Sequence, residues 1–328
     1  MRFLLRRLFF YAVAGWVALT LNFLIPRMMP GDPATALVAR FQGELQPEAV
    51  EALKEAFGFT DAPMWEQYLS YLSHLFRGDL GISVSYFPAP VSSILSTGLA
   101  WTVVLAGTAV VISFLLGSVL GLYSAWRRDS TLGSLLPPIF ALLGAFPYFW
   151  LAMLALWALA LGLGAFPLRH AYGEAVTPGW NLDFFISAVR HAVLPASTIV
   201  VATLGGWLLQ MRNNVISVMD HSYVRLAQTK GLSPTRVLVH YVARNAMLPS
   251  ITGFGMALGF VLSGSLLTEI VFAYPGQGYL LVQAVRNQDF PLLQGLFLTI
   301  TFAVLGANLL VDILYVWLDP RTRSEESN

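Results

Sequence analysis

The side chains of this chain of 328 residues form no catalytic constellation that the sequence reveals. It contains no cysteine, which excludes disulfide bonds, thiol catalysis and cysteine metal sites. No Gly-Lys-Ser or Gly-Lys-Thr follows a predicted strand, so the chain has no phosphate-binding loop with which to hydrolyse ATP. The five histidines are dispersed without metal-ligand spacing: His74, His170, His191, His221 and His240. We therefore predict a non-catalytic protein without a metal or cofactor of its own, which takes its energy from a partner or an ion gradient.

Ionisable side chains inside apolar segments are the next candidates for function, because a charge within a membrane span is costly. Glu269 lies near the outer end of one such segment, where it either lines a solute path or is a satisfied carboxylate at a helix end. Asp312 lies about two turns from the inner end of another segment, and we interpret it as a structural partner for cytoplasmic helices. A proton- or sodium-coupled carrier usually needs buried carboxylates near mid-membrane, and the sequence has no convincing set.

Small polar and aromatic side chains at mid-depth form a second set of candidates. Ser263 and Ser265 flank Gly264 in one apolar segment, and Trp207 and Gln210 lie in the preceding one. Close helix packing is the alternative role for the glycine. We expect these groups to line a translocation path: Trp207, Gln210, Ser263, Ser265 and Glu269.

The composition defines the elements that must position these groups. Hydrophobic residues make up 56% of the chain and charged residues only 11%, which excludes an ordinary soluble globular protein. The net charge of +1 and the scattered basic residues give no indication of nucleic-acid binding. We predict an all-α integral membrane protein with six spans, each long enough to cross a core of about 30 Å: 8–25, 99–122, 132–163, 192–211, 247–270 and 292–318.

Two of these segments have special features. The first follows three arginines, and a signal peptide is the competing interpretation, but the apolar run continues far beyond the possible cleavage site at Ala12-x-Ala14. We therefore favour an uncleaved span. The third contains Pro137, Pro138 and Pro147, so it should kink or begin with a surface segment.

Six spans place both termini on one side. With the N-terminus inside, the short inner segments hold twelve of the nineteen basic residues, which predicts cytoplasmic termini and a cytoplasmic loop at 212–245. Residues 26–97 would then be extracytoplasmic, with helices predicted at 47–57 and 63–76. This insertion is either a lid or docking surface, or a small helical cap that shields span ends.

The polar segment 212–245 is predicted to form two short helices joined by a hinge. The first runs from about Asp220 to Lys230 and ends at Gly231. The second begins with Ser233 as N-cap and Pro234 at its first position. Four residues should form an apolar ridge with a basic end, directed away from the chain: Tyr223, Leu226, Ala227 and Lys230.

This segment resembles the cytoplasmic loop of binding-protein-dependent ABC importers, which carries the motif E-A-A-x-x-x-G followed by an apolar residue and Pro. Arg225-Leu226-Ala227 occupies the first three positions, Gly231 the glycine and Leu248-Pro249 the end, with Arg225 in place of the acidic residue. The resemblance implies a coupling helix that docks on an ATP-hydrolysing subunit through Tyr223, Arg225, Leu226, Ala227, Lys230 and Gly231.

Other motifs extend the resemblance to essentially the whole chain. The block 268–291, the Pro30-Gly31-Asp32-Pro33 exit and the end at 318–321 resemble the dipeptide/oligopeptide/nickel branch of these permeases. In the block, Pro275-Gly276 predicts a turn, Gly278 a second unusual backbone angle, and a short helix should precede Pro291.

The resemblance implies the type I ABC importer permease fold in the plasma (inner) membrane. The implied partners are a second homologous permease, two ATPase subunits that bind ATP and Mg, and an extracytoplasmic solute-binding protein. The corresponding regions are an N-terminus with first span (1–25), an insertion (26–97), a five-helix core (98–318) with the coupling loop 212–247, and a tail (319–328).

The function expected from these features is half of a translocation path for peptides. Permeases for oligosaccharides or nickel are the alternatives within the family. A secondary transporter or channel would work without ATPase subunits. An integral membrane enzyme is disfavoured because no acid/base or metal cluster faces a common depth.

Overall fold

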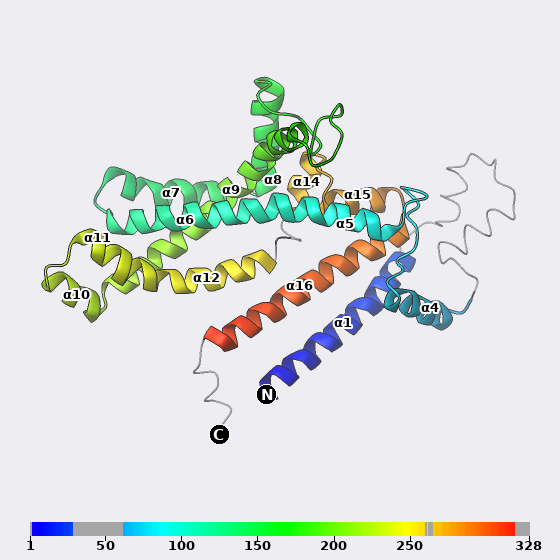
Figure 1. The fold of residues 1–328 in the computed structure, drawn as a ribbon, viewed down its shortest axis with the longest axis horizontal. Coiled ribbons are helices and arrows are strands. Elements are labelled where there is room, and N and C mark those ends of the chain that lie inside the picture. Colours follow the sequence, from blue (N-terminus) through cyan, green and yellow to red (C-terminus); the bar gives the residue numbers. More distant parts are fainter. Residues whose placement is uncertain (1, 29–61, 260, 262–264, 319–328) are drawn as a thin grey trace. The chain divides into compact units, whose positions relative to one another are not determined.

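The structure is a computed structural model, and it describes residues 2–28, 62–259, 261 and 265–318 (Figure 1). These residues form helices and connecting turns, with one isolated bridge between Ile82 and Pro90 and no β-strand among them. The predicted helix at 47–57, the Pro30–Pro33 exit, Ser263 and Gly264 lie outside the described residues. The chain divides into two compact units, one comprising 1–102 with 275–309 and the other 103–274 with 310–328.

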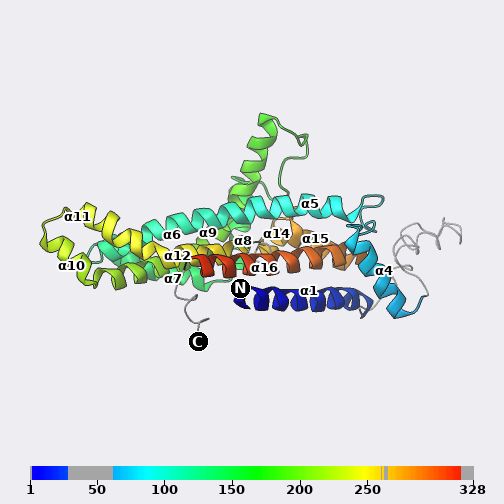
Figure 2. The ribbon, with the colours of Figure 1, turned by 60° about the horizontal axis from the view of Figure 1, so that its bottom comes forward.

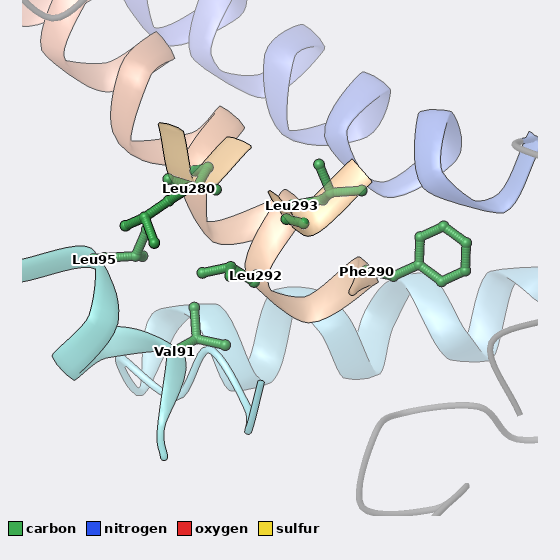
Figure 3. Close-up of a cluster of buried hydrophobic side chains, with 8 residues drawn as sticks. Val91, Leu95, Leu280, Phe290, Leu292 and Leu293 are labelled. Atoms are coloured by element: carbon green, nitrogen blue, oxygen red, sulfur yellow. The ribbon is translucent and has the colours of Figure 1, made fainter. Parts of the chain in front are cut away.

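The first unit is built from α1 (Arg2–Met28), α4 (Met64–Phe76), α5 (Val91–Thr102), α15 (Gln277–Arg286) and the first part of α16 (Phe290–Leu318). Its core lies where α5 meets α15 and the start of α16, and Figure 3 shows Val91 and Leu95 beside Leu280, Leu292 and Leu293. The predicted helix at 63–76 is confirmed as α4, whose C-cap Arg77 is followed by Gly78 with φ of 74°.

The second unit is organised around α9 (Leu182–Met219), against which several helices pack. These are α6 (Thr108–Trp126), which follows the π-helical segment η1 (Val103–Gly107), α7 (Thr131–Ala145), α8 (Tyr148–Ala155), which continues into η2 (Leu156–Gly162), and α12 (Arg244–Gly259). The remaining elements are α10 (Ser222–Thr229), α11 (Pro234–Arg236), η3 (Val237–Ala243) and α14 (Leu266–Val271).

Four helical segments are long and apolar enough to cross a membrane: Arg6–Met28, Val91–Trp126, Leu182–Met219 and Phe290–Leu309. Thr131–Ala145 and Tyr148–Gly162 are separated by a bend of 92°, and they add a fifth segment if together they form one broken span. This bend confirms the kink predicted in the third segment and places it at Pro147, the N-cap of α8, while Pro137 and Pro138 remain inside α7. The chain is therefore a multi-span helical protein, with four or five spans among the described residues.

The turn before α15 differs from the prediction in one respect. The short helix before Pro291 is confirmed as α15, but Gly278 lies inside it and has no positive φ. The left-handed residues are Ala273 (φ 45°) and Gln288 (φ 52°), each one position beyond the C-cap of a helix. After α14, the N–H of Ala273 donates to the carbonyl of Ile270, and the N–H of Tyr274 donates to the carbonyl of Glu269. This pair of bonds at the end of a helix requires a residue with a left-handed φ, which here is Ala273. Helix termination thus determines where the unusual angles lie.

Close contact between helices of the second unit depends on glycine. A Cβ added at Gly205 of α9 would collide with the carbonyl oxygen of Phe140 of α7, whereas one added at the neighbouring Gly206 would meet nothing within 4 Å. We expect Gly205→Ala to lower the thermal unfolding temperature of the purified chain, because overpacking costs about 1–3 kcal/mol and exceeds the helix-propensity gain of about 1 kcal/mol. Gly206→Ala is the matched control and should leave it unchanged or raise it. Equal effects of the two substitutions would contradict this packing.

Candidate functional site

The segment between α9 and α12 forms a folded projection at one end of its unit. α10 and α11 lie together at this end in both views (Figures 1 and 2). α10 begins after His221, two residues later than predicted, because Asp220 is the C-cap of α9. The predicted start of the second helix is confirmed, with Ser233 as N-cap and Pro234 at the first position.

A specific hydrogen-bond pattern ends α10. Lys230 is the C-cap, and Gly231 follows with φ of 71°, a left-handed angle that side chains with a Cβ disfavour. The N–H of Gly231 donates to the carbonyl of Gln228 (2.9 Å), and that of Leu232 donates to the carbonyl of Ala227 (3.4 Å). This pair of bonds is the Schellman motif. The glycine therefore fixes the direction in which the chain leaves α10.

The inner face of α10 is anchored in an apolar cluster. Val224 and Ala227 are buried, and they lie one helical turn apart on the side that faces the rest of the unit. The buried members of the cluster come from α6, α9, α10, η3 and α12: Ala125, Met211, Val215, Val224, Ala227, Val237, Val242 and Ala246. Because these side chains pack together, a displacement of α10 must also displace the ends of the long helices.

The outer face of α10 carries apolar and basic groups. Leu226 is 55% exposed and Tyr223 is 37% exposed, and Lys230 is exposed beside them. The Arg225 guanidinium lies 3.9 Å from the Asp220 carboxylate, but both side chains are highly exposed, so this pair adds little stability. The ridge predicted from the sequence is thus present for Tyr223, Leu226 and Lys230.

Two features of the segment were predicted wrongly. Ala227 does not belong to the outer ridge, because it points into the cluster with Val224, whose part in the anchor was missed. The apolar pair at spacing three, Val224 and Ala227, was the available signal. The second helix is also not short: α11, η3 and α12 follow one another without a break from Pro234 to Gly259, and Pro249 lies inside α12.

The residues that the sequence predicted to line a translocation path lie in two different places. Trp207 and Gln210 line an open groove of about 580 Å³ in the second unit, together with Phe140, Gly144, Thr203 and Ala257. The Trp207 ring packs edge-on against Phe114, with centroids 5.3 Å apart. Ser265 and Glu269 are not among the groove's lining residues. Both are buried, and the Ser265 hydroxyl donates to the Glu269 carboxylate at 2.8 Å.

Comparison with known families decides what this arrangement belongs to. Residues 117–324 match the family described as the binding-protein-dependent transport system inner membrane component, and residues 1–114 match the N-terminal region of such membrane components. The chain belongs to this family. As a permease component of a binding-protein-dependent ABC transport system, it is a multi-pass membrane protein and is not itself catalytic. Among the described residues, no group of three or more histidines or carboxylates could hold a metal ion.

Curated relatives of this permease cover nearly its whole length. A probable D,D-dipeptide transport system permease of Escherichia coli (strain K12) is 34% identical over 94% of this chain and 93% of its own. A dipeptide transport system permease of the same strain is 31% identical over 99% of this chain and 100% of its own. A putative peptide transport system permease of Brucella abortus (strain 2308) is 36% identical over 92% of this chain and 93% of its own.

Proposed function

We propose that this permease forms half of the translocation path of an ATP-driven importer of small peptides, and that α10 is the element on which an ATP-hydrolysing subunit docks. The observation that carries this proposal is the two-sided packing of α10. Val224 and Ala227 bind it to the ends of α6, α9 and α12, while Tyr223 and Leu226 remain exposed. An anchored helix with an exposed apolar ridge is suited to transmit a partner's motion.

The mechanism follows from this anchoring. When two ATPase subunits close on ATP and Mg, the docked α10 moves with them, and the apolar cluster carries that movement to the long helices. Because α11, η3 and α12 form one continuous helical run, the displacement reaches α12 as well as α9. The path would then open outward beneath a solute-binding protein, and inward after hydrolysis.

The character of the docking surface follows from its exposed residues. Leu226 and Tyr223 supply apolar contact of the kind that dominates binding energy at interfaces, with Lys230 at the rim. Arg225 stands where the motif has an acidic residue, so this permease would not present a carboxylate to its partner at that position. The partner cleft should accordingly be apolar at its centre, with acidic or neutral groups opposite Arg225.

The finer topology is part of the proposal. Six spans would result if the bent pair α7–η2 and the α12–α14 segment each cross once, in addition to the four long helical segments. Both termini and the loop 212–247 would then be cytoplasmic, and residues 26–97 extracytoplasmic, as the distribution of basic residues favours. The partners would be a second homologous permease, two ATPase subunits and an extracytoplasmic binding protein.

The groove beside α9 is the proposed contribution of this chain to the path. Gln210 offers both a hydrogen-bond donor and an acceptor, which suits the amide groups of a peptide, and Trp207 offers an apolar wall. Glycines at 144, 205 and 206 leave part of the lining without side chains. Ser265 and Glu269, being buried and bonded to one another, are better suited to stabilise the first turn of α14 than to contact solute.

Peptides are the proposed cargo because the relatives described above are named as dipeptide or peptide transport permeases. Oligosaccharide and nickel permeases are the alternatives. The test is uptake of labelled dipeptides into proteoliposomes that contain the assembled transporter and its binding protein, with and without internal ATP. We expect uptake only with ATP. Uptake driven by an ion gradient without ATP would favour a secondary carrier and overturn the proposal.

A further inference from the structure

The helix α4 is joined to the last turns of α1 by a polar and aromatic seam. The Thr20 and Tyr68 hydroxyls lie 2.8 Å apart, and the Asn22 amide donates to the Tyr71 hydroxyl at 3.2 Å. The buried Phe23 ring packs against the rings of both tyrosines. Burial raises the pKa of Tyr71, in keeping with a phenol held inside the seam. These contacts fix α4 to α1 although 35 residues separate the two helices in the sequence.

The seam also fixes the position of α4 beside the last turn of α1. Arg27 lies in the last turn of α1, where its guanidinium donates to the Gln67 side chain of α4 at 3.2 Å and lies 3.7 Å above the centre of the Phe23 ring. A charged group at the end of a span marks the boundary between acyl chains and headgroups. In both views α4 crosses the end of α1 steeply instead of continuing along it (Figures 1 and 2).

The part of α4 that does not contact α1 has two different faces. Trp65, Leu69 and Phe76 recur at helical spacing, with the half-buried Leu72 between them, and are 63%, 56% and 84% exposed. This set is called the α4 stripe. A second exposed side of the helix carries polar residues: Glu66, Ser70, Ser73 and His74. No residue of α4 is buried, and three of the four residues of the stripe are exposed.

We propose that α4 is an interfacial helix that lies in the plane of the membrane at the end of α1, with the α4 stripe inserted among the lipid acyl chains and its polar face in water. Such amphipathic helices lie at the headgroup boundary with aromatic and leucine side chains buried. The seam supports this placement because it holds α4 directly beside the membrane span α1, at the level of Arg27 in the last turn of α1. α4 itself contains no lysine or arginine, so the insertion rests on apolar contact and should not need anionic lipid.

The chain's lack of cysteine permits a direct test. Leu69→Cys and Phe76→Cys place a single nitroxide label on the stripe, and Ser70→Cys is the matched control on the polar face of the same helix. The labelled full-length chain is purified together with its partner subunits, and the complex is placed in phosphatidylcholine nanodiscs. Collision with oxygen, which concentrates in lipid, is then compared with collision with a water-soluble nickel chelate by electron paramagnetic resonance.

We expect the labels at 69 and 76 to collide more with oxygen than with nickel, and the label at 70 to show the reverse. Adding phosphatidylglycerol should not change the ratio. Equal nickel accessibility at all three positions would overturn the proposal, because the stripe would then face water. Low collision with both reagents at 69 and 76 would also overturn it, because the stripe would then be covered by protein, either another part of the chain or a partner. Neither result would depend on what the permease transports.

Discussion

Leu226→Asp is expected to abolish ATP-driven uptake while leaving the permease inserted in the membrane. Leu226 is more than half exposed and lies on the outer face of α10, so the substitution removes little packing inside the chain. In the docked state the same change would put a carboxylate into an apolar contact. Loss of such a central contact typically costs 2 kcal/mol or more, which corresponds to an association about 30-fold weaker.

The measurement is uptake and solute-stimulated ATPase activity of the reconstituted transporter. Thr235→Asp is the matched control: it adds the same charge to an exposed position of the same projection, in the first turn of the following helix, where a carboxylate is favoured. We expect Thr235→Asp to behave as the unsubstituted chain. If Leu226→Asp retained full stimulated ATPase activity and uptake, the docking role of α10 would be wrong.

Gly231→Pro is expected to disable transport through the backbone alone. Proline fixes φ near −65°, whereas this residue has φ of 71°, and it removes the N–H that donates to the Gln228 carbonyl. The loss of the bond and the forced change of direction should cost about 3 kcal/mol or more locally. α10 would then leave its anchor, and movement of the partner would no longer reach α9 and α12.

Asparagine at the same position separates backbone strain from the loss of glycine itself. It tolerates the left-handed region, and a Cβ at Gly231 would meet nothing within 4 Å. Gly231→Asn should therefore keep most of the uptake that Gly231→Pro loses, while both variants reach the membrane in similar amounts. Equal uptake by the proline variant would show that the exit from α10 does not need its present geometry.

Local signals explain which parts of the projection could be predicted from the sequence. Helix ends depend on a few neighbouring residues, and the breaker at Gly231 and the Ser233-Pro234 start each act within one turn. The same holds for Pro147, which forces the bend between α7 and α8. The end at Gly231 and the start at Ser233-Pro234 were identified correctly, whereas the kink was predicted for a segment with three prolines, of which only Pro147 lies at the bend.

Features that depend on distant contacts could not be predicted in the same way. The spacing of Val224 and Ala227 was a signal for the inward side of α10, but the sequence does not place their packing partners Met211, Val215 and Val242 beside them. Gly278 seemed to offer an unusual angle, yet α15 absorbs it, and the ends of α14 and α15 impose that angle on Ala273 and Gln288 instead. The groove at Trp207 and Gln210 likewise depends on how α7 packs on α9.

The most direct test of the proposed coupling is a crosslink from the outer face of α10. Because the chain has no cysteine of its own, Leu226→Cys provides a single attachment point on this chain for a short photo-crosslinker, which is attached before the transporter is assembled. We expect a crosslink from position 226 to an ATP-hydrolysing subunit, with a yield that changes when ATP is added. If the crosslinker at position 226 reacted only with lipid or solvent while the transporter remained active in ATP-driven uptake, the proposed docking role of α10 would be wrong.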